Sequence, residues 1–200
     1  MPDLLYCPPR RTMSIISTTK MTSAQFLELG EDPVGVRLEL VNGEVAVSPS
    51  ATPNHSYTEK ILGAILVTHV RTKKLGRLYG DVDTIFGRHD VRRPDLIFFS
   101  KHRLDLVGEK AMEGPPDLCV EIVSPGSRLI DRRDKFKQYA KGKVAYYWIV
   151  DPEDHTAEAF KLTRRGFTAA GRGKDNDVVS FPPFPDLRIS LGELWQPRRK

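Results

Sequence analysis

Two apolar runs near the middle of the chain each contain an acidic residue: Asp95 in the segment RRPDLIFF and Glu121 in the segment PDLCVEIVSP. Both runs are predicted to be β-strands, because they are short, rich in branched and aromatic residues, and bounded by Pro or Ser. A carboxylate inside such a strand is costly unless it is paired, hydrogen-bonded or bound to a metal ion. These two residues therefore constrain the fold and the chemistry together.

The spacing of the two acidic residues allows their strands to be neighbours. They are 26 positions apart (121 − 95), enough for the chain to turn and come back. Two adjacent carboxylates would repel each other unless a divalent cation lies between them. Oxygen ligands favour Mg²⁺, Mn²⁺ or Ca²⁺ over zinc, and a magnesium-bound water can attack phosphate. For each residue taken alone, a structural ion pair or a place at a strand end explains the sequence equally well.

A basic segment over residues 128–143 is predicted to be a helix. Asp131, Lys135 and Tyr139 follow one another at steps of four, so we expect them to share a face. A lysine beside metal-bound carboxylates can orient a water and stabilise charge that develops on phosphate. The segment holds seven lysines and arginines against two aspartates, which suits a phosphate-rich substrate. A solvated helix face with an exposed Asp–Lys pair is the competing interpretation.

The remaining patterns predict one mixed domain. The dipeptide Asn42-Gly43 between alternating residues is the strongest hairpin signal. The predicted elements are helices at 23–30, 53–74 and 128–143, strands at 93–100, 115–125 and 144–152, a bent strand or tight hairpin at 76–87, short antiparallel strands after residue 155, and a last helical turn at 191–195. This order predicts an α/β or α+β fold with a central mixed β-sheet flanked by helices. We expect a flexible extension at 1–17, the domain at 18–195 and a basic tail at 196–200.

Composition excludes several classes of protein. Hydrophobic residues make up 40% of the chain and charged residues 28%, as in ordinary globular domains. The longest apolar stretch, residues 144–150, is far shorter than the roughly 20 residues of a membrane helix. Cys7 and Cys119 form no Cys-x-x-Cys pair, and the N-terminus lacks a signal-peptide pattern. These features predict a cytoplasmic protein with no membrane partner.

The order of the candidate residues, with Pro-Asp first, then Glu on a following strand and then lysine, resembles the PD-(D/E)XK nuclease superfamily. Within it, the chain is similar to the bacterial Uma-type family of restriction endonucleases. The segments that carry the resemblance are RLELVNGEVAVSPSATPNHS, RRPDLIFF, PPDLCVEIVSPGSRLIDRRDKFKQYAKGKVAYYWIVDP and LRISLGELW, which together span roughly residues 22–195. The block from Pro115 to Pro152 is the most specific of them.

The resemblance implies roles for individual residues. Asp95 and Glu121 would bind Mg²⁺ or Mn²⁺, Lys135 would be the catalytic lysine, and Glu39 would be an additional acidic site residue. One departure is clear: no lysine follows Glu121 on its strand, where the sequence reads Glu-Ile-Val. In Uma-type sequences a helix lysine takes that place, and Lys135 stands at the matching position.

Three further residues are candidates for substrate contact or support of the site. They are His55 at the start of the long predicted helix, Asp131 and Tyr139. Each also has a structural interpretation: a capping or packing histidine, a helix N-terminal acid, and a core aromatic.

The implied function is metal-dependent endonucleolytic hydrolysis of DNA, with a homodimer suggested only by analogy with nucleases that cut two strands. The main alternative is a non-catalytic nucleic-acid-binding or protein-interaction module that keeps the nuclease fold. A weaker alternative is a metal-dependent hydrolase that acts on another phosphate ester.

Overall fold

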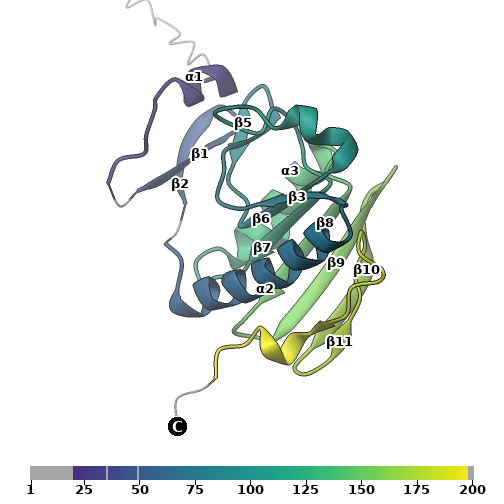
Figure 1. Ribbon diagram of the computed structural model, residues 1–200. Coiled ribbons are helices and arrows are strands. Elements are labelled where there is room, and N and C mark those ends of the chain that lie inside the picture. The colour runs from purple at the N-terminus through teal and green to yellow at the C-terminus, as the bar shows by residue number, and fades with distance from the viewer. Residues whose placement is uncertain (1–19, 35, 49, 198–200) are drawn as a thin grey trace, which may run out of the picture.

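The computed structural model describes residues 20–34, 36–48 and 50–197 (Figure 1). The predicted extension at 1–17 and residues 198–200 of the predicted tail lie outside the described residues. The first half of the chain forms α1 (Ser23–Leu27), β1 (Arg37–Val41), β2 (Glu44–Ser48), α2 (Pro53–Thr72), β3 (Gly76–Tyr79), β4 (Thr84–Gly87), β5 (Asp90–Arg92) and β6 (Leu96–Ser100). The second half forms the 3₁₀ helix η1 (Lys101–Leu106), β7 (Leu118–Ile122), the π-helical segment η2 (Ile130–Lys135), α3 (Phe136–Lys141), β8 (Tyr146–Asp151), β9 (Thr156–Thr163), β10 (Gly166–Lys174), β11 (Val178–Val179), β12 (Ile189–Ser190) and the 3₁₀ turn η3 (Leu191–Glu193).

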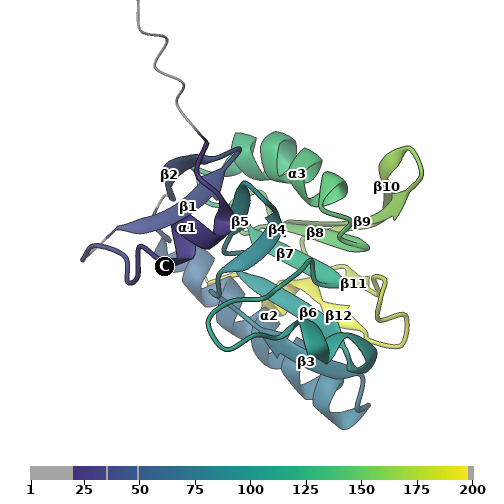
Figure 2. The same cartoon turned by 90° about the horizontal axis from the view of Figure 1, so that it is seen from above.

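A six-stranded mixed sheet forms the centre of the fold, in the order β10-β9-β8-β7-β6-β3. The pair β7–β8 is parallel, whereas β6–β7 and β8–β9 are antiparallel. Helices α2 and α3 lie on opposite sides of this sheet (Figure 2). The predicted α+β class, with a central mixed sheet flanked by helices, is confirmed.

The side chains of strand β7 alternate between the two faces of the central sheet. All five of its residues are buried. Leu118, Val120 and Ile122 pack in the cluster that contains the apolar stripe of α2, whereas Cys119 packs on the other face with Tyr139 of α3. Glu121 points to the same side as Cys119, because side chains alternate along a strand. The carboxylate therefore faces the helix that contains Lys135.

A second sheet, in the order β2-β1-β5-β4, stands beside the central one (Figure 1). Its first two strands form the hairpin predicted at Asn42-Gly43, and both turn residues have positive φ angles, of 51° and 83°. Phe26 of α1 packs with Leu40 and Val91 to cover this sheet. The second sheet brings the β1–β2 hairpin close to the ends of β6 and β7.

The prediction for residues 76–87 is wrong. Instead of one bent strand or a hairpin, β3 pairs with β6 in the central sheet and β4 pairs with β5 in the second sheet. The chain crosses between the sheets near Gly80, where an added Cβ would lie 2.6 Å from the Asp95 carbonyl oxygen. Alternation of side chains indicates a strand but not its partner, so the sequence pattern could not separate these cases.

Helix α2 begins at Pro53, as the sequence predicts, and the structure shows Thr52 as its N-cap. The Thr52 hydroxyl accepts a hydrogen bond from the His55 backbone N–H at 3.2 Å. In the part of the chain that the structure describes, no helix is long and apolar enough to cross a membrane.

Candidate active site

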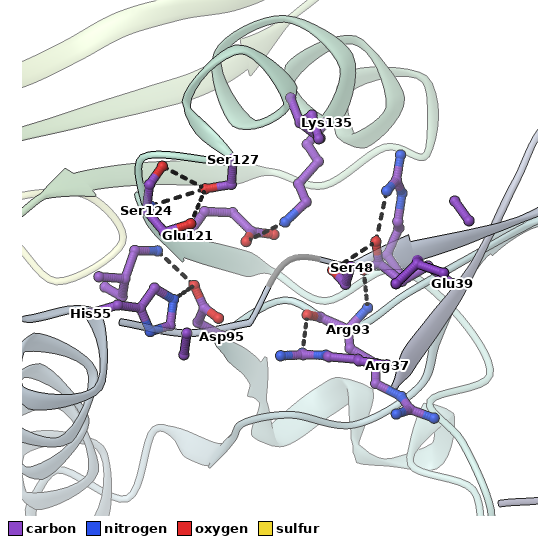
Figure 3. Close-up of a pocket in the computed structure, with 16 residues that line it drawn as sticks. Arg37, Glu39, Ser48, His55, Arg93, Asp95, Glu121, Ser124, Ser127 and Lys135 are labelled. Atoms are coloured by element: carbon purple, nitrogen blue, oxygen red, sulfur yellow. Dashed lines mark hydrogen bonds and ion pairs between the residues drawn. The ribbon is translucent and has the colours of Figure 1, made fainter. Parts of the chain in front are cut away.

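Most of the residues singled out from the sequence meet at one pocket (Figure 3). The pocket has a volume of about 90 Å³ and lies between the two sheets and the η2–α3 helix. The predicted residues that line it are Glu39, His55, Asp95, Glu121 and Lys135. Asp131 and Tyr139 stand behind this lining, where they contact Lys135 and Glu121 respectively.

The antiparallel pairing of β6 with β7 places the two strand carboxylates together. Leu96 is opposite Val120, so Asp95, one residue before β6, stands across from Glu121. Oδ2 of Asp95 accepts a hydrogen bond from the backbone N–H of Ile122 at 2.7 Å. The same oxygen lies 3.1 Å from Nε2 of His55. Within the described residues, Oδ1 of Asp95 has no hydrogen-bond partner, so one oxygen of this carboxylate remains available.

Glu121 is fully engaged by donors on the helix. Its Oε2 accepts a hydrogen bond from Nζ of Lys135 at 2.6 Å, and its Oε1 accepts one from the hydroxyl of Tyr139. Burial raises the pKa of Glu121 to about 8, although the nearby charge of Lys135 opposes this. Burial alone would lower the pKa of Lys135, but the charges of Glu121 and Asp131 outweigh it and hold that pKa above its ordinary value. The lysine therefore stays cationic.

The turn that contains Asp131 and Lys135 is a π-helix, where the sequence suggested a regular α-helix. In an α-helix, four residues advance about 40° beyond one full turn, so residues eight apart diverge by about 80°. A π turn contains more residues, which offsets this drift, and such turns recur at functional sites. Asp131, Lys135 and Tyr139 consequently face the same point, and the shared face that their spacing predicted is confirmed by their contacts.

Asp131 is an unusual buried carboxylate. It is 1% exposed, and its Oδ1 lies 3.0 Å from Nζ of Lys135. Neither of its carboxylate oxygens accepts a hydrogen bond from a described residue. Its contribution to the site is thus its charge, which favours the cationic form of Lys135.

Glu39 lies in the pocket wall and is held by an arginine that the sequence interpretation missed. Its Oε2 accepts a hydrogen bond from Arg92 at 2.8 Å, and its Oε1 accepts one from the backbone N–H of Arg93 at 3.0 Å. Burial alone would raise the pKa of Glu39, but the charges of Lys135 and Arg92 hold it below its ordinary value. Nε of Arg92 also donates to Gln138 of α3 at 2.7 Å. Arg92 therefore links the second sheet to the lysine helix.

His55 contacts Asp95 rather than capping α2, since Thr52 supplies the cap. The histidine is 7% exposed, and its Nδ1 is buried without a hydrogen-bond partner among the described residues. Burial alone would lower the pKa of His55, but the hydrogen bond and charge of Asp95 raise it above its ordinary value. The side chain thus fixes the orientation of the Asp95 carboxylate.

The donor set fits a hard divalent cation. Four buried carboxylates, from Glu39, Asp95, Glu121 and Asp131, gather around two permanent cations, Lys135 and Arg92. The described residues hold no group of three or more His, Cys, Asp or Glu side chains arranged as metal ligands. Magnesium needs no such cage, since it binds one or two carboxylates and keeps waters or phosphate oxygens as its other ligands. The available Oδ1 of Asp95 and the adjacent Glu121 carboxyl group suit that mode of binding.

Comparison with known protein families identifies the family of this chain. The Uma2 family model, described as "Putative restriction endonuclease", matches residues 23–192. The chain belongs to this family. The Uma2 match confirms the resemblance found in the sequence and supports a nuclease that acts on nucleic acid; restriction-endonuclease-like families generally use a divalent metal.

A solved structure shows the same fold as this Uma2 chain. It is the crystal structure of a "putative nuclease belonging to DUF820" from Anabaena variabilis, with a TM-score of 0.72 and 20% sequence identity. The alignment covers 88% of this chain and 97% of that chain. A search of curated proteins found no match.

Proposed function

We propose that the pocket hydrolyses phosphodiester bonds of DNA with the help of Mg²⁺ or Mn²⁺, as an endonuclease of the cytoplasm. The observation that carries this proposal is the convergence of Asp95, Glu121 and Lys135. The β6–β7 register sets the two carboxylates opposite each other, and Lys135 binds Glu121 at 2.6 Å. Membership of the Uma2 family supports nuclease chemistry.

Asp95 and Glu121 are the residues that would hold the cation. When bound, the cation supplies an activated water and neutralises charge on the phosphate. Asp95 is prepared for this role, because the Ile122 N–H and His55 hold one of its oxygens and leave the other available.

Lys135 acts as a fixed positive charge rather than as a base. Its pKa lies above its ordinary value, so it keeps its protons at neutral pH. An ammonium group at the pocket wall stabilises the negative charge that develops on the phosphate oxygens during attack. Glu39, which is held by Arg92, adds negative charge that favours this cationic form.

Cleavage of plasmid DNA tests the proposal. Purified protein with Mg²⁺ or Mn²⁺ should convert supercoiled plasmid to nicked and linear forms, and Asp95→Asn should abolish the conversion. Asp186→Asn provides a matched control, because Asp186 is an exposed acid outside the pocket lining. DNA binding without cleavage by either the original protein or Asp95→Asn would favour the non-catalytic module instead.

A further inference from the structure

A larger groove adjoins the catalytic pocket. It has a volume of about 680 Å³ and lies between the β1–β2 hairpin and the η2–α3 helix. Ala46, Arg92 and Ile130 line both the groove and the pocket, so the two are neighbours. The pocket, at about 90 Å³, is much smaller than the groove. A nucleic acid strand cut there must therefore lie largely outside it.

The structure separates the basic residues of segment 128–143 into two groups. Four of them form ion pairs with acidic residues: Arg128 with Asp151 and Asp154, Arg132 with Glu158, Arg133 with Asp134, and Lys135 with Glu121 and Asp131. Lys137, Lys141 and Lys143 have no ion-pair partner within the described ranges. Lys137 and Lys141 are exposed and line the groove. The positive charge of this helix that remains available is thus concentrated beside the pocket.

We propose that this groove binds the sugar-phosphate backbone of the DNA strand that is cut, with Lys137 and Lys141 as its phosphate contacts. The proposal rests on the proposed nuclease function. The two lysines are four residues apart and lie on one face of α3, separated by about 6 Å along the helix axis. They can therefore contact different phosphates of one strand. Such contacts position DNA without reading its sequence.

Three carboxylates, from Glu44, Asp90 and Asp134, also line the groove, and their charges oppose this binding. Asp90 accepts hydrogen bonds from Gln138 and from the backbone N–H of Asn42, and Asp134 pairs with Arg133. Glu44 lines the groove on β2, is exposed, and has no ion-pair partner in the described part of the chain. Removal of this negative charge should strengthen binding, which gives a test of opposite sign to the lysine variants.

The salt dependence of DNA binding tests the groove directly. Binding of a short fluorescein-labelled DNA duplex is followed by fluorescence anisotropy in EDTA, so that no cleavage occurs, over a range of KCl concentrations. The double variant K137Q/K141Q should lower the slope of log K against log [salt] by about 2, since each lost phosphate contact contributes about 0.9. E44Q should raise the affinity.

A matched control is available at the far end of α2. Lys73 and Lys74 are exposed lysines at the end of α2 opposite His55, so K73Q/K74Q removes the same charge away from the groove and should leave the slope unchanged. Equal slopes for K137Q/K141Q and the original protein would overturn the proposal and leave the nuclease function standing, with the lysines then simply solvated. A failure of the original protein to bind DNA in EDTA would likewise overturn the groove proposal, whereas the nuclease function is decided separately by the plasmid-cleavage assay with Mg²⁺ or Mn²⁺.

Discussion

Asp95 and Glu121 face each other across the antiparallel pair β6–β7, and Lys135 of the η2–α3 helix donates a hydrogen bond to Glu121. Asp95 keeps an oxygen available, whereas both oxygens of Glu121 accept hydrogen bonds from Lys135 and Tyr139. Asp95 can therefore bind a cation without losing a contact, whereas a cation that binds Glu121 must compete with Lys135 and Tyr139. The stability of the metal-free protein and its response to cations both follow from this relationship.

Loss of the lysine charge should destabilise the metal-free protein. Lys135→Met leaves Glu121 and Asp131 buried beside each other without their cation, and breaking a buried pair in this way costs about 3–5 kcal/mol. Urea unfolding at pH 8 in EDTA measures the loss. The double variant Lys135→Met/Glu121→Gln should recover part of it, and an unchanged midpoint in the single variant would contradict the pairing.

The Arg92–Glu39 pair should behave as a coupled unit. Both side chains are buried, so Arg92→Met leaves an uncompensated carboxylate and should lower the free energy of unfolding by about 3–5 kcal/mol. Arg92→Met/Glu39→Gln should lose less than the sum of the single losses. Urea unfolding of all four proteins gives the coupling energy. Additive losses would show that the two groups do not interact.

The pKa of Glu121 predicts a pH dependence of stability. The pKa is raised from 4.5 to about 8 in the folded protein, so between these values the folded state binds more protons than the unfolded state. The free energy of unfolding in EDTA should therefore fall as the pH rises from 4.5 towards 8. Glu121→Gln removes the titrating group and should flatten this part of the curve. An equal fall in the free energy of unfolding of Glu121→Gln would show that groups other than Glu121 cause the pH dependence.

The affinity of the protein for Mn²⁺ should rise with pH, whereas its stability in EDTA falls. Because Mn²⁺ must displace the proton from Glu121, its apparent affinity should rise by up to about tenfold per pH unit below pH 8 and level off above it. Titration calorimetry at several pH values measures this rise. An affinity that is independent of pH between 6 and 8 would mean that Glu121 is not a ligand.

Asp95 and Glu121 could be predicted as site residues from the sequence because each is a charged residue in an otherwise apolar strand. A carboxylate within an apolar strand needs a partner, which drew attention to Asp95 and Glu121. Steps of four on a predicted helix placed Asp131, Lys135 and Tyr139 on one face, and the structure brings all three to the site. The hairpin was predictable for a similar reason, since Asn42-Gly43 favours a turn with positive φ angles.

The features that the sequence did not predict depend on partners far apart in the chain. Arg92 contacts Glu39 and Gln138, which are 53 and 46 positions away, and no periodic pattern relates them. The only available signal was an arginine directly before the Arg-Pro-Asp run. The crossing of residues 76–87 between two sheets was missed because alternation does not identify a strand's partner. The π turn was missed because composition does not distinguish it from an α turn.

Diffraction from crystals soaked in Mn²⁺, recorded at a wavelength where manganese scatters anomalously, shows whether Asp95 and Glu121 hold a cation. We expect an anomalous peak in the pocket, within direct coordination distance of Oδ1 of Asp95 and of the Glu121 carboxylate, and no such peak in crystals of Asp95→Asn. A pocket without a peak at saturating Mn²⁺, or a peak that persists unchanged in Asp95→Asn, would contradict this expectation.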